Sequence, residues 1–338
     1  MTRFIAHRVA LGLLVVVGVV VLTFVIARVI PGDPATNWVG PHASPVQLAR
    51  ARHTLGLDRP LPAQIVDYLR GIVSGDWGIS IHTKQPVLSD LGTRAPASIE
   101  LVAAGMFLAL LAGIPLGLLS ARWAGRAPDV GVRLVAVVGV SMPVFWLALI
   151  LQLIFFQKLQ VLPVSGQYDP DVAAAHPLQA YTHMPVVDSL VAGNWPMFRS
   201  SLTHLVLPAI VVAAYPMGVV ARMVRASVLE TLGEDHVRMT RALGFPERTI
   251  FAHFALRPAL NPVVSVIALV FAYALVNTFL VEAIFDWNGL GSYAADSIQA
   301  LDTPAVIGVT LFIAIFYVVA NLVVDIVQAF VDPRIRLR

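Results

Sequence analysis

The side chains that could carry out chemistry are present but are not grouped as a catalytic or metal site would require. The nine histidines include no His-x-x-x-His or His-Glu-x-x-His pair, and His176 and His183 lie in an irregular loop. The sequence has no Gly-x-Ser-x-Gly hydrolase elbow and no cysteine. Neither of its two lysines, Lys84 and Lys158, follows a glycine, so no Gly-Lys-Ser/Thr loop can cradle a nucleotide phosphate. We therefore expect no catalytic residue, no metal site and no cofactor bound by this chain.

The composition is that of a membrane protein. Of the 338 residues, 58% are apolar and 13% are charged, and the apolar residues form blocks of about 20, the length of helix that crosses a ~30 Å hydrocarbon core. Arginines flank these blocks instead of forming one patch, which argues against nucleic acid as a partner. The first block, 9–27, exceeds a signal-peptide core and has no small-x-small cleavage pattern after it, so we interpret it as a retained span.

Six spans are expected in an all-α fold, at 9–27, 98–120, 134–156, 205–220, 263–285 and 305–327. Arg122, Arg126 and Arg133 surround the turn after the second span, whereas the loop 286–304 holds three aspartates and no basic residue. The positive-inside rule then places both termini, the 121–133 turn and the 222–262 loop in the cytoplasm.

The expected organisation has three parts. Residues 1–30 form an N-terminal cytoplasmic segment and the first span, 31–97 an external helical cap, and 98–338 the core transmembrane domain. In the cap, the stretches 46–57 and 63–73 have the apolar spacing of helices. Within the core, the external loop 158–203 is mostly irregular, with one helix expected near 185–191.

The polar 222–262 loop is the most informative segment. It predicts a helix from about 230 to 243 that ends at Gly244, followed by a second helix from 246 to 256. The second helix has more apolar surface than a solvated tether needs, so we expect this surface to be covered. Acidic residues come early and basic residues late in the first helix, as its macrodipole favours: Glu234, Asp235, Arg238 and Arg241.

The run HVRMTRALGFPERTIFAHFALRPALNP (236–262) resembles the cytoplasmic loop of permease subunits in binding-protein-dependent ABC importers of the dipeptide/oligopeptide/nickel subfamily. The chain departs from the pattern at 238–240, where Arg-Met-Thr replaces Glu-Ala-Ala, and at Pro258 and Asn288. Further stretches are similar to the same subfamily, namely PGDPA (31–35), LGLDRPLPAQ (55–64), GDWGIS (75–80), FDWNGLGSYAADSIQALDTP (285–304) and VDPRIR (331–336).

The resemblance implies a type I importer permease with a short coupling helix that docks on an ATP-hydrolysing subunit through the 234–257 loop. It implies three kinds of partner, namely a second homologous permease, two subunits that bind ATP and Mg²⁺, and an extracytoplasmic substrate-binding protein. It also implies that this chain lies in the plasma (inner) membrane. The docking residues it implies are Glu234, Asp235, Arg238, Arg241, Ala242, Gly244, Phe245 and Pro246.

Polar residues within the spans are candidates for a translocation pathway. Pro143 should kink the third span, because it removes a helical hydrogen bond. Glu100 and Glu282, near the outer ends of their spans, either face water or serve the pathway, and Asp325 could pair with Arg334 or Arg336. The pathway candidates are Ser141, Met142, Asn277, Thr278 and Glu282.

Several functions remain open at this point. Di- or oligopeptides are the leading substrates, and nickel complexes, glutathione-like peptides and oligosaccharides are alternatives within the same class. A six-span channel, a secondary transporter or a membrane scaffold would leave the 236–262 pattern unexplained. The absence of an internal repeat also argues against a transporter built from two inverted halves.

Overall fold

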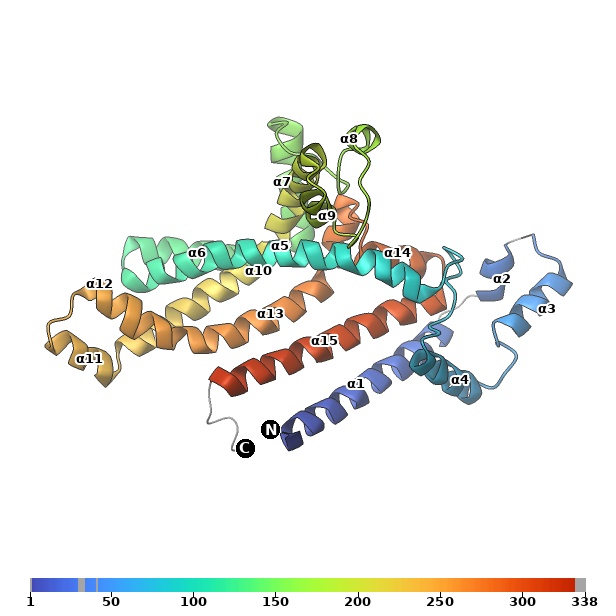
Figure 1. Ribbon diagram of the computed structural model, residues 1–338, viewed down its shortest axis with the longest axis horizontal. Helices are drawn as coiled ribbons and strands as arrows, with labels where there is room; N and C mark the ends of the chain where they lie inside the picture. Colours follow the sequence, from blue (N-terminus) through green and yellow to red (C-terminus); the bar gives the residue numbers. More distant parts are fainter. Residues whose placement is uncertain (1, 30–33, 41, 332–338) are drawn as a thin grey trace.

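Long apolar helices make up most of the computed structural model, which describes residues 2–29, 34–40 and 42–331 (Figure 1). Parts of the 31–35 and 331–336 motifs, and the side chains of Asp325, Arg334 and Arg336, lie outside the described residues. The helices of the first half are α1 (Thr2–Val29), α2 (Pro34–Val39), α3 (Pro45–Thr54), α4 (Leu61–Ser74), α5 (Val87–Arg122), α6 (Ala127–Ser141), α7 (Val144–Leu151) and the π-helical η1 (Gln152–Lys158). Those of the second half are α8 (Pro170–Ala175), α9 (Pro185–Val191), α10 (Trp195–Leu232), α11 (Asp235–Ala242), α12 (Glu247–Thr249), the π-helical η2 (Ile250–Ala255), α13 (Leu256–Phe285), α14 (Leu290–Gln299) and α15 (Thr303–Val331).

The number of candidate spans agrees with the six expected. Within the described part of the chain, four single helices are long and apolar enough to cross a membrane: α1, α5, α10 and α15. Two bent pairs raise the number to as many as six. They are α6 with α7–η1, and the stretch 247–260 with 262–275.

The fourth span is much longer than the expected 205–220, because α10 continues as a helix at both ends. Past residue 220, Val224 and Val228 repeat every four residues and are buried against α5 and α13. Arg222 and Arg225 made this stretch look like a loop, but Arg222 is exposed on the same helix and Arg225 is paired with Asp129 of α6.

Small residues allow α5 and α10 to pack closely. A Cβ atom added at Gly117 of α5 would lie 2.6 Å from the Ala221 carbonyl oxygen of α10, and one at Gly105 would lie 2.6 Å from Val212. Without a Cβ the two backbones can approach, which is a common basis of helix association in membranes. Helix α10 is therefore in contact with α5 along much of its length, and α13 packs beside both.

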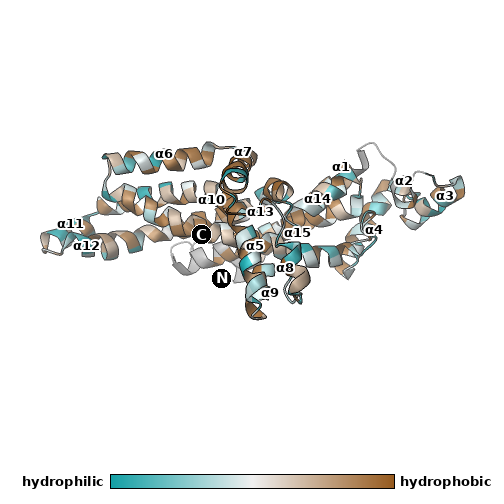
Figure 2. Ribbon diagram, turned by 90° about the horizontal axis from the view of Figure 1, so that it is seen from above, coloured by the Kyte–Doolittle hydropathy of each residue, from teal (hydrophilic) through white to brown (hydrophobic). Residues whose placement is uncertain are grey.

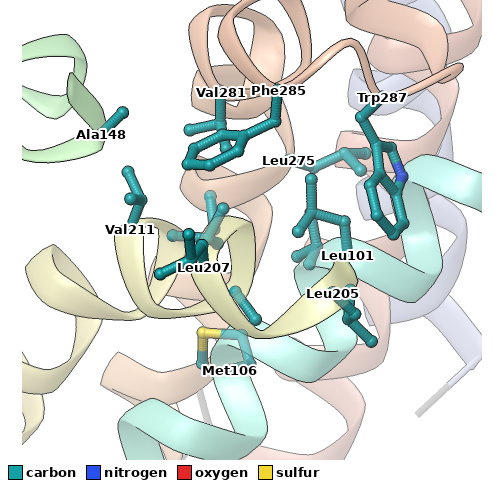
Figure 3. Close-up of a cluster of buried hydrophobic side chains, with 14 of the residues drawn as sticks. Leu101, Met106, Ala148, Leu205, Leu207, Val211, Leu275, Val281, Phe285 and Trp287 are labelled. Carbon is teal, nitrogen blue, oxygen red and sulfur yellow. The ribbon is translucent and has the colours of Figure 1, made fainter. Parts of the chain in front are cut away.

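The largest apolar core forms where α5, α7, α10 and α13 meet (Figure 3). Trp287 closes this core at one end, with its indole Nε1 donating to the Ala97 carbonyl oxygen at 3.0 Å. The side chains drawn in the figure include Leu101 and Met106 from α5, Ala148 from α7, Leu205, Leu207 and Val211 from α10, and Leu275, Val281 and Phe285 from α13.

The third expected span is sharply broken. Met142 has an extended backbone (ψ 127°) and Pro143 precedes α7, so α6 and α7–η1 meet at 106°. The kink predicted at Pro143 is confirmed, but it is large enough that α6 runs along the bundle while α7 projects from it (Figure 1).

Two groups of short helices lie at opposite ends of the bundle (Figure 1). Helices α2, α3 and α4 mark the cap end, and α3 and α4 confirm the two helices expected there. Helices α11 and α12 mark the loop end, where hydrophilic residues are frequent, whereas α6, α10 and α13 are mainly hydrophobic (Figure 2). Helix α9 matches the one helix expected in 158–203, but α8 and α14 were not expected.

Candidate docking loop and membrane hollow

The polar segment between α10 and α13 holds α11, α12 and η2, and their bounds differ from those of the two helices expected. The first helix does not begin near residue 230, because Glu230 still belongs to α10; α11 begins at Asp235 after a break at Gly233. The expected second helix, 246–256, is not separate either. Helix α12, η2 and α13 follow one another without an interruption, so this stretch is the tilted start of the fifth span.

The turn after α11 is the one that the sequence predicts. Gly244 has φ +80°, in the left-handed region that favours glycine. Its N–H donates to the Arg241 carbonyl oxygen at 3.1 Å, and the N–H of Phe245 donates to the Thr240 carbonyl oxygen at 3.3 Å. These two bonds form a Schellman motif, which satisfies the last carbonyls of α11 and fixes the direction of the chain after it.

Helix α11 is anchored on η2. Val237 is fully buried, and Nε2 of His236 lies 3.1 Å from the Phe254 carbonyl oxygen. The ring of Phe245 meets the ring of Phe254 edge-on, with the centroids 5.6 Å apart. The loop is therefore held to the bundle as a shaped protrusion.

A charged pair closes the same turn from the solvent side. Nε of Arg241 donates to the Glu247 carboxylate at 2.6 Å, and Nη2 donates to its other oxygen at 3.3 Å. Both side chains are about half exposed or more, so the pair orients the loop but adds little stability.

All eight docking residues inferred from the sequence are exposed on this protrusion. Two apolar side chains that were not singled out from the sequence, Met239 and Leu243, are each 64% exposed on the same protrusion. They lie four positions apart, so Met239 and Leu243, the residue that caps α11, share one face. That spacing, on the side opposite Val237, is a signal that the sequence already contained.

The apolar surface expected on 250–256 is covered by this chain and does not need another molecule. Ile250 is fully buried, and Phe251 and Leu256 pack into the cluster formed by α5, α10 and α13. The apolar surface that the loop presents to solvent is that of Met239, Leu243 and Phe245.

Four of the five pathway candidates line one hollow in the middle of the bundle. Its volume is about 280 Å³, and its walls are the α6–α7 break, α10 and α13. The candidates that line it are Ser141, Met142, Asn277 and Thr278. Tyr215 and Tyr273 also line it, with their ring centroids 5.1 Å apart. The hollow combines an apolar wall with hydroxyl and amide groups.

Glu282 does not line this hollow. It is fully buried, and its carboxylate accepts hydrogen bonds from the Ser98 hydroxyl at 2.6 Å and from the Gly291 N–H at 2.6 Å. It therefore joins α5, α13 and α14. Glu100 is buried as well, where it accepts from the Val186 N–H at 3.0 Å. Neither carboxylate faces water. Each instead accepts hydrogen bonds from backbone N–H groups at the start of a neighbouring short helix, α9 for Glu100 and α14 for Glu282.

Residues 113–337 match the family described as the binding-protein-dependent transport system inner membrane component, and residues 1–102 match the N-terminal part of such components. The chain belongs to this family. It is an all-helical multi-pass protein of the inner membrane, and its family is one of transport components that work with a substrate-binding protein.

Relatives of this permease match over almost its whole length. It is 43% identical to the probable D,D-dipeptide transport system permease protein DdpB of Escherichia coli K12, over 95% of this chain and 94% of the relative. It is 39% identical to the di/tripeptide transport system permease protein DppB of Pseudomonas aeruginosa, and 36% identical to the dipeptide transport system permease protein DppB of Escherichia coli K12, each over 99% of both chains.

Proposed function

We propose that the chain is one permease subunit of an ATP-driven importer of di- or oligopeptides. It forms half of the translocation pathway, and a second homologous permease forms the other half. Two ATP-binding subunits hydrolyse ATP with Mg²⁺ on the cytoplasmic side, and the substrate-binding protein delivers its cargo from outside. The peptide class is supported by the relatives, which are named as dipeptide or di/tripeptide permeases.

The observation that carries the proposal is the α11 protrusion. Met239, Leu243 and Phe245 are held exposed at the loop end by the buried Val237 and by the Gly244 turn. An exposed apolar face with a charged border is a suitable docking surface for a folded partner. We infer that an ATPase subunit accepts this face together with Glu234, Asp235, Arg238, Arg241, Ala242 and Pro246.

In this mechanism the permease itself carries out no chemistry. Closure of the ATPase subunits around ATP moves α11, and α10 and α13 transmit the movement to the hollow lined by Ser141, Met142, Asn277 and Thr278. The pathway has an inward-open and an outward-open state. Nucleotide and the loaded binding protein must each bind one of these states more tightly, because a ligand that binds both equally does not shift the equilibrium between them. Both termini and the α11 loop lie in the cytoplasm.

Purification from the native membrane in mild detergent tests the assembly. The tagged chain should retain a second permease and two ATPase subunits, and the Gly244→Val variant should lose the ATPases while keeping the permease partner. Elution of the wild-type chain alone, or as a homo-oligomer without any ATPase, in several detergents would overturn the importer assignment. A binding assay with the partner substrate-binding protein and dipeptides, compared with nickel complexes, glutathione and oligosaccharides, tests the substrate class.

A further inference from the structure

A fully buried carboxylate lies at the loop end, outside the docking loop and the hollow. Asp129, in the first turn of α6, has no exposed surface. One of its oxygens accepts from the Ser120 hydroxyl at 2.5 Å and from Nε of Arg225 at 2.7 Å. The other accepts from the Gly125 N–H at 2.8 Å and from Nη2 of Arg225 at 3.0 Å. Three parts of the chain therefore meet on this carboxylate.

The contact with Arg225 is the one that reaches across the bundle. Ser120 and Gly125 precede Asp129 by only a few residues, whereas Arg225 belongs to α10. The guanidinium engages both oxygens, and such paired, charge-assisted bonds have a strict geometry. Nε of Arg133 also lies 3.5 Å from the Asp129 carboxylate, but Arg133 belongs to α6 itself and so joins no second helix. Arg225 is the cation that connects α6 to α10, and removing such a partner from a buried carboxylate is unfavourable, so the pair holds the two helices in one arrangement.

A second contact joins the same two helices nearer the hollow. A Cβ atom added at Gly218 of α10 would lie 2.6 Å from the Ala136 carbonyl oxygen of α6, so the two backbones touch there. A Cβ atom added at Gly139 of α6 would lie 2.9 Å from the Ala214 carbonyl oxygen of α10. Helix α6 is thus fixed to α10 from the Asp129 turn to the edge of the hollow.

The location of Arg225 links these contacts to docking. It lies seven residues before Leu232, the end of α10, which is roughly 10 Å along a helix. Helix α11 begins three residues later, at Asp235. At its other end α6 leads to Ser141 and Met142, which line the hollow. The Asp129–Arg225 pair therefore lies between the docking helix α11 and the wall of the hollow.

We propose that the Asp129–Arg225 pair is a positioning contact that makes α6 follow α10 when the ATPase subunits move α11, so that the wall of the hollow at 141–143 moves with the docking helix. The inference rests on the function proposed above. Arg225 and Asp129 touch neither substrate nor ATPase in this scheme, and they act through the helices that they join.

The test uses the complete importer reconstituted in lipid vesicles. Asp129→Asn and Arg225→Gln should retain the ATPase subunits and their unstimulated ATP hydrolysis, but peptide uptake per ATP hydrolysed should fall about tenfold, the scale of a coupling free energy. Arg225→Lys keeps the charge and should recover part of the coupling. Arg126→Gln is the matched control, since it removes an exposed guanidinium from the same turn and should leave coupling unchanged. Normal coupling in both Asp129→Asn and Arg225→Gln would overturn the inference.

A distance measurement keeps the inference falsifiable if these variants fail to accumulate. Because the chain has no native cysteine, spin labels can be placed at Leu134→Cys on α6 and Arg222→Cys on α10, both exposed, with Asp129 and Arg225 intact. The distance between the labels should be the same in nucleotide-free and ATP-trapped importer. A change between the two states would show that α6 does not follow α10. Failure of the wild-type chain to retain any ATPase would instead refute the proposed function.

Discussion

At the scale of single residues, the α11 protrusion depends on one backbone conformation. Gly244 has φ +80° and donates to the Arg241 carbonyl, and this turn directs Phe245 back onto Phe254. A side chain at this position has open space around it, so the constraint is one of backbone conformation alone.

The Gly244→Val substitution should abolish peptide uptake without preventing membrane insertion. Valine in the left-handed region costs about 1–3 kcal/mol, which favours a different turn and misplaces Phe245. Gly233→Ala is the control, because Gly233 lies in the same loop with φ −82°, so alanine there needs no left-handed backbone, although its Cβ would lie 3.2 Å from the Glu230 carbonyl oxygen. Uptake assays and ATPase co-purification measure the effect. Normal uptake by Gly244→Val would refute the docking assignment.

Met239 and Leu243 should contribute directly to ATPase binding. Burying such a side chain contributes about 1.5–3 kcal/mol, so each change to alanine should weaken ATPase affinity about tenfold or more. The structure of the permease alone should not change, because both side chains face solvent. Titration of purified ATPase subunit onto the permease in nanodiscs measures the affinity. Val73→Ala, which removes an exposed apolar side chain at the cap end, should have no effect.

Reversing the charge at Arg241 tests whether this residue contacts the ATPase subunit or only supports the shape of the loop. Arg241→Glu should abolish uptake, and the exposed pair that it breaks contributes only about 0.2–1 kcal/mol, so the fold should persist. The double variant Arg241→Glu/Glu247→Arg restores the pair inside the loop but leaves the docking face with the reversed charge. We expect uptake to stay low in the double variant. Full recovery would mean that Arg241 only supports the loop.

At the scale of elements, the contact between α5 and α10 is set by the glycines of α5. We expect Gly117→Leu to destabilise the bundle by about 1–3 kcal/mol or more, because its Cβ would lie 2.6 Å from the Ala221 carbonyl oxygen. Gly92→Leu is a matched control on the same helix, where an added Cβ has no neighbour within 4 Å. Thermal unfolding of the two variants in detergent makes the comparison. Equal stability would contradict the close-packing account.

The break between α6 and α7 is the other decisive element. A proline in the third span predicted a kink, but the 106° angle depends on the neighbours, since α6 is fixed to α10 by Gly139, Gly218 and the Asp129–Arg225 pair. With α6 held in this way, α7 leaves the bundle at residue 143, and the break becomes part of the wall of the hollow.

At the scale of the whole molecule, the separation of cap end and loop end predicts a topology. A membrane-impermeant maleimide added to intact cells should label Val73→Cys in the cap and should not label Arg126→Cys until the membrane is permeabilised. Both positions are exposed, and the chain has no cysteine of its own. Labelling in the opposite order would reverse the orientation inferred from the positive-inside rule.

The features that could be predicted from the sequence alone are those that depend on local composition and on the spacing of residues. Blocks of about 20 apolar residues specify membrane helices because bilayer thickness is fixed. The Gly244 turn and the Pro143 kink follow from the backbone properties of those two residues, and the spacing of apolar residues was enough to predict α3 and α4.

Which helices are continuous, and which side chains surround each charge, depends on contacts between segments that are distant in the sequence. The stretch 222–232 looks like a loop until α5 and α13 cover Val224 and Val228, and the apolar face of 250–256 looks free until the chain packs against it. Glu282 is held by donors from α5 and α14, and Asp129 by Arg225, far away in the sequence. A buried carboxylate requires such partners, and spacing along the chain cannot show which residues supply them.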